Sequence, residues 1–441
     1  MTRHSIRPLA GAAATRTAAL AALLLAAPWL PSSAAAADTT RETLSLDRAV
    51  SLALRAEDPN LARLGAQAEA LEAEAVADGQ LPDPVISTQV ANVPTDTFAL
   101  DQADMTQLRL GVRQEFPPGR SRAVKTAMRR SEADVRRAEQ AMERRRIVLE
   151  TRRAWLELAW RTRAAAIVEA SLDRVRQQID SLSARFASGR LNAQDVLRSE
   201  LELALLQDRL AEHRRKAQAA RADLRRYIGP AAAAPLPETW PDQPDPPPLE
   251  RLVDALPAHP AVLARSAQIE AADAGVELAG EAYKPTWALE GGYGIRQDRP
   301  DFASIGVTVS LPVFTDKRQD RRHVAAVRAR SAARLARDAV LLELRRQLDR
   351  AHSDWQRYDQ RRRLYAEAVQ ARARQTAEAS VVTYANGQTD FAELIRSQLA
   401  ELDTAVARQE LEARVRQTWA EIDYLTGAEP ASATPHTGDA S

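Results

Sequence analysis

Four short segments of the chain alternate between hydrophobic and polar or small residues. In residues 107–116, one face of the alternation holds Leu108, Leu110, Val112 and Phe116. The other face holds Arg109, Gly111, Arg113 and Glu115. The same pattern runs through residues 286–295 and 304–311, and more weakly through 85–93. A period of two residues predicts β-strands, so we expect two antiparallel pairs.

The apolar faces of these strands are unusual because the opposite faces are polar and rich in glycine. The residues expected to face lipid are Leu108, Leu110, Val112, Trp287, Leu289, Tyr293, Ile305, Val307 and Val309. Strands of about ten residues that are apolar outside and polar inside are typical of membrane β-barrels. The stretch GGYG at 291–294 could suggest a phosphate-binding loop, but no helix begins after it. We therefore interpret its glycines as strand residues that face the lumen. A small sheet packed on one side against helices is the alternative.

The rest of the chain consists of long helical segments. We expect helices over 46–80 and 249–281, over 122–185 and 318–383, and over 192–228 and 390–425. The middle pair contains no proline, and at about 1.5 Å per residue each helix would span about 95–100 Å. A helix of that length needs coiled-coil neighbours. Apolar residues at the required spacing of 3.5 are Val168, Leu172, Val175, Ile179, Leu182 and Phe186, and Leu344, Leu348, Ala351, Trp355 and Tyr358.

The two halves of the chain are copies of one unit. Matching residues keep nearly constant offsets: 201 for Pro59 and Pro260, 195 for Gly111 and Gly306, 200 for Trp155 and Trp355, and 198 for Gly189 and Gly387. A period this long indicates a duplicated half rather than a solenoid of short repeats. The resulting plan is helix–strand–strand–long helix–helix, twice, with four strands in the chain.

A related motif ends the long helix in each half. FASGRLNAQDVLRS spans residues 186–199, and YANGQTDFAELIRS spans 384–397. Gly189 and Gly387 suit the left-handed residue that ends a helix. Asn192 and Asp390 suit the N-cap of the return helix, with Asp195 and Glu393 three residues later. Each motif is therefore predicted to be the turn at the tip of a helical hairpin, and turn chemistry alone accounts for much of it.

Composition excludes several functions. The 441 residues carry a net charge of +1, which gives no reason to expect a nucleic-acid partner. The chain has no cysteine, so disulfides, thiolate metal sites and a lipid on cysteine are excluded. Its six histidines are scattered without a pair at helical spacing, and no nucleophile–base arrangement is visible. We therefore expect no metal site, no cofactor and no enzymatic activity.

The N-terminal residues are typical of a secretory signal. Arg3, Arg7 and Arg16 precede an apolar run of about 14 residues, too short to span a bilayer, and an Ala-x-Ala site precedes Asp38. An N-terminal membrane anchor is the alternative. The predicted divisions are a cleaved signal at 1–37, a first repeat at 38–228, a proline-rich linker at 229–248, a second repeat at 249–427 and a disordered tail at 428–441.

Four strands are too few to close a membrane barrel, and an unpaired strand edge is costly in lipid. Several copies of the chain must then contribute strands to one barrel. Three copies would supply twelve strands, with a ring of helical hairpins beside them. We therefore predict a tube that conducts cargo out of the cell.

The order of these features resembles the TolC-like outer-membrane factor family over about residues 40–427. The resemblance rests on the two tip motifs, on the strand–helix corners EFPPGRSR (115–122) and SLPVFTDKR (310–318), and on the duplicated plan. It implies a homotrimer with a twelve-stranded barrel in the outer membrane and a periplasmic α-helical tunnel. Such a duct receives cargo from an inner-membrane pump through a periplasmic adaptor protein. The positions implied for adaptor contact are Gly189, Leu191, Asn192, Asp195, Gly387, Thr389, Asp390 and Glu393.

The stretch GQLPDPVISTQVANVP (79–94) resembles the branch that partners RND-type heavy-metal-cation pumps, the CzcC and CusC type. That resemblance implies heavy-metal cations as cargo. The same duct serving drug efflux or type I protein secretion is an alternative. A periplasmic coiled-coil scaffold or adaptor is an alternative of another class, although adaptors carry domains rich in short strands that this chain lacks.

Overall fold

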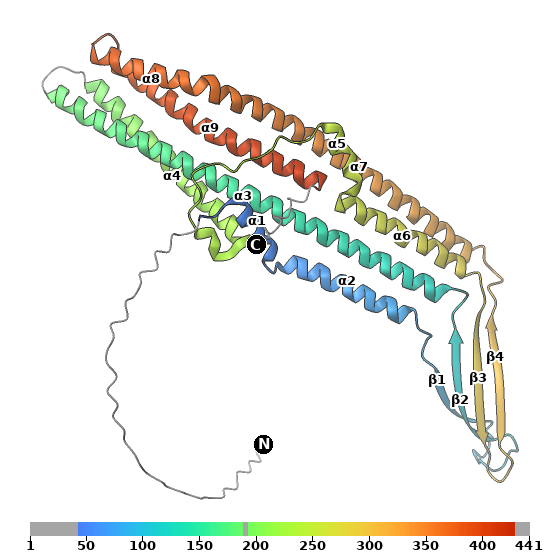
Figure 1. Ribbon diagram of the computed structural model, residues 1–441. Helices are drawn as coiled ribbons and strands as arrows, with labels where there is room; N and C mark the ends of the chain where they lie inside the picture. Colours follow the sequence, from blue (N-terminus) through green and yellow to red (C-terminus); the bar gives the residue numbers. More distant parts are fainter. Residues whose placement is uncertain (1–42, 188–192, 428–441) are drawn as a thin grey trace, which may run out of the picture. The chain divides into compact units, whose positions relative to one another are not determined.

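The computed structural model describes residues 43–187 and 193–427 (Figure 1). The first half contains α1 (Leu46–Arg55), α2 (Pro59–Asp78), β1 (Val85–Ala91), β2 (Gln107–Phe116), α3 (Ser121–Ala187) and α4 (Ala193–Ile228). A short 3₁₀ turn, η1 (Gly229–Ala233), opens the linker. The second half contains α5 (Leu249–Asp254), η2 (Leu256–Ala258), α6 (Pro260–Glu281), β3 (Thr286–Ile295), β4 (Phe302–Ser310), α7 (Gln319–Leu364), η3 (Tyr365–Val369), α8 (Gln370–Ala385) and α9 (Phe391–Thr426).

The first helix of each half is broken, so the predictions of continuous helices over 46–80 and 249–281 are wrong. The break after α1 falls where Asp58 caps α2 by accepting a 2.8 Å hydrogen bond from Asn60 N. Pro59 follows at the first helical position, where its missing N–H costs nothing. In the second half, His259 Nδ1 accepts from Ala261 N in the same way, ahead of Pro260.

The long helix of the second half is also interrupted. A π turn, η3, separates α7 from α8, so the prediction of one α-helix over 318–383 is wrong. The offset between the repeats falls from 200 at Trp355 to 198 at Gly387, and the π turn lies between these two residues. Its counterpart α3 runs unbroken for 67 residues, as the sequence predicts.

All four strands form one antiparallel sheet in the order β1-β2-β3-β4. β1–β2 and β3–β4 are the two expected pairs, and β2 pairs with β3 to join the halves. β1 ends at Ala91, before the predicted 93, because Asn92 has a positive φ of 57°. β4 begins at Phe302, two residues before the predicted start at 304. It ends at Ser310, one residue before the predicted end at 311.

The long helices form the scaffold that holds the sheet. α2, α4, α6 and α9 all pack on α3, and α6 and α9 also pack on α7 (Figure 1). The predicted seams are buried at Val168, Leu172 and Val175 and at Leu344 and Leu348. Because α6 and α9 belong to the second half, α3 carries contacts between the two repeats.

The largest buried cluster lies where α1, α3 and α4 meet. Trp155 is fully buried there, and its indole N–H donates a 2.9 Å hydrogen bond to Leu44 O. Leu156, Leu158, Leu224 and Ile228 surround it. This cluster fixes the first short helix and the start of the linker against the long helix.

Candidate functional site

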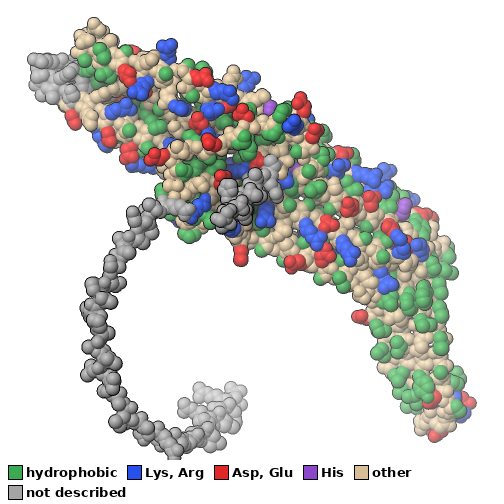
Figure 2. All heavy atoms as spheres, viewed as in Figure 1, with side chains coloured by type: hydrophobic (Ala, Val, Ile, Leu, Met, Phe, Trp, Pro, Cys, Tyr) green, Lys and Arg blue, Asp and Glu red, His purple; other side chains and the backbone are tan. Residues whose placement is uncertain are grey.

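The sheet presents one apolar face. The register places Leu110 opposite both Thr88 and Tyr293, and Leu289 opposite Val307, so the nine residues predicted to face lipid share one side of the sheet. These side chains are exposed in the single chain, from 42% for Leu108 to 86% for Ile305. Figure 2 shows the hydrophobic side chains gathered over the strands. An apolar surface this continuous marks a place where something other than water covers the protein.

The opposite face of the sheet is polar and small. Arg113 and Glu290 are register partners and form a 2.9 Å ion pair, and Thr308 donates a 3.1 Å hydrogen bond to Glu290. Arg109 donates to Ser304 Oγ at 3.2 Å. A Cβ on Gly292 would lie 2.7 Å from Ser304 Oγ, so this glycine leaves room for the neighbouring hydroxyl. This face is suited to contact with water.

The GGYG stretch divides between the two faces. Gly292 and Gly294 lie on the polar face, as predicted. Gly291, however, pairs with Val112 and Ile305 on the apolar face. The prediction that the glycines of this stretch lie on the polar, lumen-facing side is therefore wrong for Gly291, because strand residues alternate in direction.

The loops at the far end of the sheet are tied together across the two halves. Arg299 forms a 2.6 Å ion pair with Asp104, and Arg296 donates to the backbone oxygen of Asp104 at 3.0 Å. Arg296 also stacks over the Phe302 ring at 3.8 Å. Asn92, in the left-handed conformation, donates to Met105 O and closes the β1–β2 loop.

The tip between α8 and α9 has the turn chemistry that the sequence predicts. Gly387 has a φ of 70°, and its N–H donates to Tyr384 O at 3.0 Å. Asp390 caps α9 by accepting from Glu393 N at 2.9 Å. Thr389 lies beside Thr383, with 3.3 Å between the two hydroxyls. Glu393 pairs with Arg396, so no reciprocal capping box forms around it in the described turn.

The tip between α3 and α4 lies partly outside the described residues. Gly189, Leu191 and Asn192 fall there. Asp195 lies in the first turn of α4 and is half-buried, and its backbone oxygen accepts a 2.7 Å hydrogen bond from Ser199. Each tip therefore carries an acidic residue in the first turn of its return helix, where a negative charge is favoured by the helix dipole.

Several ionisable groups are buried away from the sheet and the tips. His259 lies against Tyr424, and burial, helped by the charge of Arg145, lowers its pKa to about 4. Burial likewise lowers the pKa of His213. Over 43–187 and 193–427, no group of three His, Cys, Asp or Glu side chains is arranged to hold a metal ion. These histidines are neutral packing residues.

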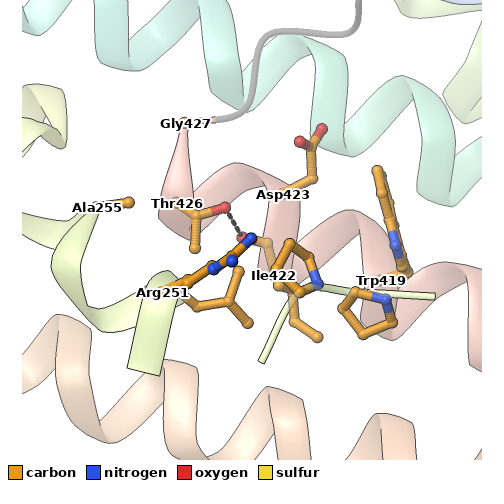
Figure 3. A pocket seen from close by; sticks show the side chains of 10 residues that line it. Arg251, Ala255, Trp419, Ile422, Asp423, Thr426 and Gly427 are labelled. Carbon is orange, nitrogen blue, oxygen red and sulfur yellow. Dashed lines mark hydrogen bonds between the residues drawn. The ribbon is translucent and has the colours of Figure 1, made fainter. Parts of the chain in front are cut away.

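A cavity of about 340 Å³ lies at the end of α9. Figure 3 shows Trp419 and Ile422 of α9 and Arg251 of α5 among the side chains that line it, with the Asp423 carboxylate directed away from Arg251. Asp423 is already paired with Arg152 of α3, and Thr426 donates to Ile422 O at 2.9 Å. The remaining lining is mostly apolar, from Pro246, Pro247 and Leu252. The cavity is a packing junction between the linker and the helices, without an acid–base pair for catalysis.

In the part of the chain that the structure describes, no helix is both long enough and apolar enough to cross a bilayer. The two features that combine exposure with distinctive chemistry are the apolar face of the sheet and the helical tips. α3 joins them, because it follows the β2 corner at one end and precedes a tip at the other.

No protein-family model and no curated protein matches the sequence. Solved structures do match. The outer-membrane protein VceC of Vibrio cholerae superposes with a TM-score of 0.73 at 19% identity, over 87% of this chain and 96% of that one. The outer-membrane channel OprN gives 0.73 at 18%, over 87% and 90%. CusC, described for its folding and transmembrane channel formation, gives 0.73 at 13%, over 86% and 91%. The chain thus has the fold of these outer-membrane channels.

Proposed function

We propose that the chain is an outer-membrane channel of the TolC-like type, the exit duct of a tripartite efflux system. The observation that carries the proposal is the four-stranded sheet with one exposed apolar face and one polar face, held at the end of very long helices. Its fold is shared with VceC, OprN and CusC over more than four-fifths of the chain, which supports the same use.

The sheet needs other copies to be stable in lipid. β1 and β4 are edge strands, and their unpaired backbone groups would each cost several kcal/mol in hydrocarbon. Three copies would join β4 of one sheet to β1 of the next and close twelve strands. The nine apolar residues would then face lipid, while Arg113, Glu290, Gly292 and Gly294 would line the water-filled interior.

The helical tips are the proposed docking surface for a periplasmic adaptor, through which an inner-membrane pump delivers cargo. The residues we assign to it are Gly189, Leu191, Asn192, Asp195, Gly387, Thr389, Asp390 and Glu393. Residues 1–37 are proposed to be a cleaved export signal, and the absence of cysteine means that the barrel alone would anchor the protein.

Heavy-metal cations are the cargo we propose, on the resemblance of residues 79–94 to the branch serving metal pumps. The Pro82 carbonyl in this stretch accepts a 2.8 Å hydrogen bond from Gln114, which fixes the entry into β1. Metal selection would belong to the pump, since the described residues of the duct hold no metal cluster. Complementation of a host lacking its own duct, challenged with metal salts and with drugs, would separate these cargoes.

The decisive experiment is purification from the outer-membrane fraction followed by reconstitution. We expect an oligomer in detergent that produces stepwise ion conductance in planar bilayers. If the protein instead leaves the membrane fraction on a salt wash and runs as a water-soluble monomer, it is a periplasmic scaffold. That result would reject the proposal that it is an exit duct.

A further inference from the structure

The two ends of the β-strands carry opposite charge. The loops at the far end, residues 92–106 and 296–301, hold five Asp and two Arg. The segments at the helical end hold eight Lys or Arg against four Asp or Glu, counted over 79–84, 117–125, 281–285 and 311–322. The excess of positive charge therefore lies where the strands join the helices, at one edge of the band of apolar side chains.

The cations near the corner between β2 and α3 are mostly bound within the chain. Arg120 and Lys284 form ion pairs with carboxylates of α6. Arg122 donates a 3.2 Å hydrogen bond to Gly79 O. These side chains are therefore committed to the junction of the sheet with the helices.

The corner between β4 and α7 differs because its cations have no acidic partner. Four exposed cations form no ion pair within the part of the chain that the structure describes: Lys317, Arg318, Arg321 and Arg322. Two acids lie in the same stretch, Asp316 and Asp320, and Asp320 accepts a 2.6 Å hydrogen bond from Tyr283. The corner therefore keeps a positive charge that the chain itself does not neutralise.

Exposed apolar side chains lie directly beside these cations. Leu311, Val313 and Phe314 are 66%, 69% and 83% exposed. Leu311 comes two residues after Val309 of β4, so the apolar side of the alternation continues into the corner. Figure 2 shows Lys and Arg side chains over the helices next to the hydrophobic side chains of the strands. The corner thus offers apolar surface and unpaired positive charge to one and the same ligand.

We infer that the corner between β4 and α7 binds an anionic phospholipid of the periplasmic leaflet. The negatively charged headgroup lies against Lys317, Arg321 and Arg322, and the acyl chains lie against Val313, Phe314 and the apolar face of the sheet. Guanidinium groups suit this role because they donate paired hydrogen bonds to phosphate oxygens. The inference rests on the proposed function, since only strands inserted in the outer membrane bring the corner to the level of lipid headgroups.

Other ligands would use only part of this surface. A zwitterionic headgroup carries its own cation, which the basic side chains would repel. A soluble phosphate compound has no acyl chain to cover Val313 and Phe314. An anionic phospholipid matches both parts, and it adds an electrostatic attachment to the hydrophobic one in a chain that has no cysteine to carry a lipid.

Lipid-dependent thermal stability tests the inference. The oligomer is purified in an uncharged detergent and titrated with phosphatidylglycerol, or with phosphatidylcholine that has the same acyl chains. A ligand that binds the folded protein raises its melting temperature, and more so the tighter it binds. Phosphatidylglycerol should raise the melting temperature. Phosphatidylcholine should not, and neither should glycerol phosphate, which is the headgroup without acyl chains.

The test variant carries Lys317→Gln, Arg321→Gln and Arg322→Gln. A Lys or Arg near an anionic lipid surface changes the affinity by about fivefold. The phosphatidylglycerol concentration that gives half of the rise should therefore increase by about tenfold or more. A triple variant that keeps the charges, with Lys317→Arg, Arg321→Lys and Arg322→Lys, should retain most of the affinity.

The matched control removes the same charge elsewhere, with Arg225→Gln, Arg357→Gln and Arg361→Gln. These three side chains are exposed and likewise form no ion pair with any described residue. Arg357 and Arg361 lie near the opposite end of α7 from the corner. The control should respond to phosphatidylglycerol as the native protein does.

A further variant, Phe314→Ser, keeps all four cations and removes apolar surface. It should also weaken the response to phosphatidylglycerol, and it tests the site even if the neutral triple variant does not assemble. Unchanged affinity in Phe314→Ser would reject the acyl-chain contact and with it the lipid.

Three other results would overturn the inference. The first is an equal response of the neutral triple variant and its control, as expected if another copy of the chain covered the corner. The second is a rise with phosphatidylcholine as large as that with phosphatidylglycerol. The third is a full response to glycerol phosphate, which would indicate an anion site without a lipid.

Conductance keeps this inference apart from the proposed function. Pores in bilayers of phosphatidylcholine, formed by a protein whose stability is indifferent to phosphatidylglycerol, would reject the lipid site and leave the duct. A water-soluble monomer without pores would reject the duct, and the lipid site with it.

Discussion

The carboxylate of Glu281, at the end of α6, accepts a 2.6 Å hydrogen bond from the backbone N–H of Arg120, in the corner between β2 and α3. It also accepts hydrogen bonds of 2.7 and 2.8 Å from Lys284, and it is buried. A side chain of the second half thus holds the corner of the first half, at the point where the sheet joins the helices.

Gly119 is expected to tolerate no side chain in this corner. Its φ is 51°, and a Cβ there would collide with the Glu281 carboxylate. Gly119→Ala should destabilise the protein by at least the 1–2 kcal/mol that a left-handed L-residue costs. Thermal unfolding of the detergent-purified protein would measure the loss. Gly291→Ala is the matched control, since nothing lies within 4 Å of its Cβ position; an equal loss in both would contradict the steric argument.

Glu281 should make stability depend on acid. Its hydrogen bonds from Lys284 and from the Arg120 N–H lower its pKa below the ordinary 4.5. A lowered folded pKa means that the stabilisation is fully present above pH 4.5 and is lost as the pH falls through the folded value. Glu281→Gln should therefore have a lower melting temperature than the native protein at pH 7. In strong acid the two melting temperatures should become equal. A deficit that stayed constant with pH would show that the charge is irrelevant.

The buried pair between Arg152 and Asp423 predicts a non-additive mutational cycle. Burial raises the pKa of Asp423, and the charges of Arg152 and Arg145 oppose that shift, so removing Arg152 takes away part of what stabilises the carboxylate. Arg152→Met should cost about 3–5 kcal/mol, because it leaves a buried carboxylate. Adding Asp423→Leu should restore most of that loss, since an apolar pair of similar volume suits the site. Chemical denaturation of the four proteins measures the coupling, and simple additivity would contradict it.

The tips should be required for transport and not for assembly. Gly387→Val places a β-branched residue at a φ of 70° in open space, so its effect is local backbone strain. Asp195→Arg reverses a charge in the first turn of α4. Both substitutions should abolish the resistance to metal salts or drugs that the native protein gives its host. The oligomer should still be seen on a semi-native gel. Gly387→Asn should retain activity, because asparagine tolerates the left-handed conformation. Full resistance in both Gly387→Val and Asp195→Arg would show that the tip is not the docking surface.

Periodicity predicts the strands well because each side chain in a strand reports its face directly. The alternation in 107–116 and 286–295 matches β2 and β3 to the residue. The sequence also carries signals for the helix breaks before α2 and α6, because Asp58–Pro59 and His259–Pro260 are capping pairs. The helix-forming residues on both sides of each pair favour a continuous helix and mask these signals.

Pairings between distant parts of the chain left no local signal. The contact of Glu281 with Arg120 joins residues 161 apart, and the pair of Arg152 with Asp423 joins residues 271 apart. The register of β2 against β3 depends in the same way on how the two halves meet. The duplication predicts that the halves are alike, but it does not predict how they pack against each other.

The apolar face of the sheet should reject charge in a way that the polar face does not. Ile305 and Thr308 lie three residues apart on β4, on opposite faces, and both side chains are exposed in the single chain. If Ile305 faces lipid, Ile305→Arg should cost about 2–4 kcal/mol per copy near the bilayer midplane. Thr308→Arg should assemble normally, because it would lie beside the carboxylate of Glu290 in a wet interior. The yield of heat-modifiable oligomer in outer membranes measures both. Equal tolerance of the two substitutions would mean that this face meets water or protein, and the strands would not form the wall of a membrane pore.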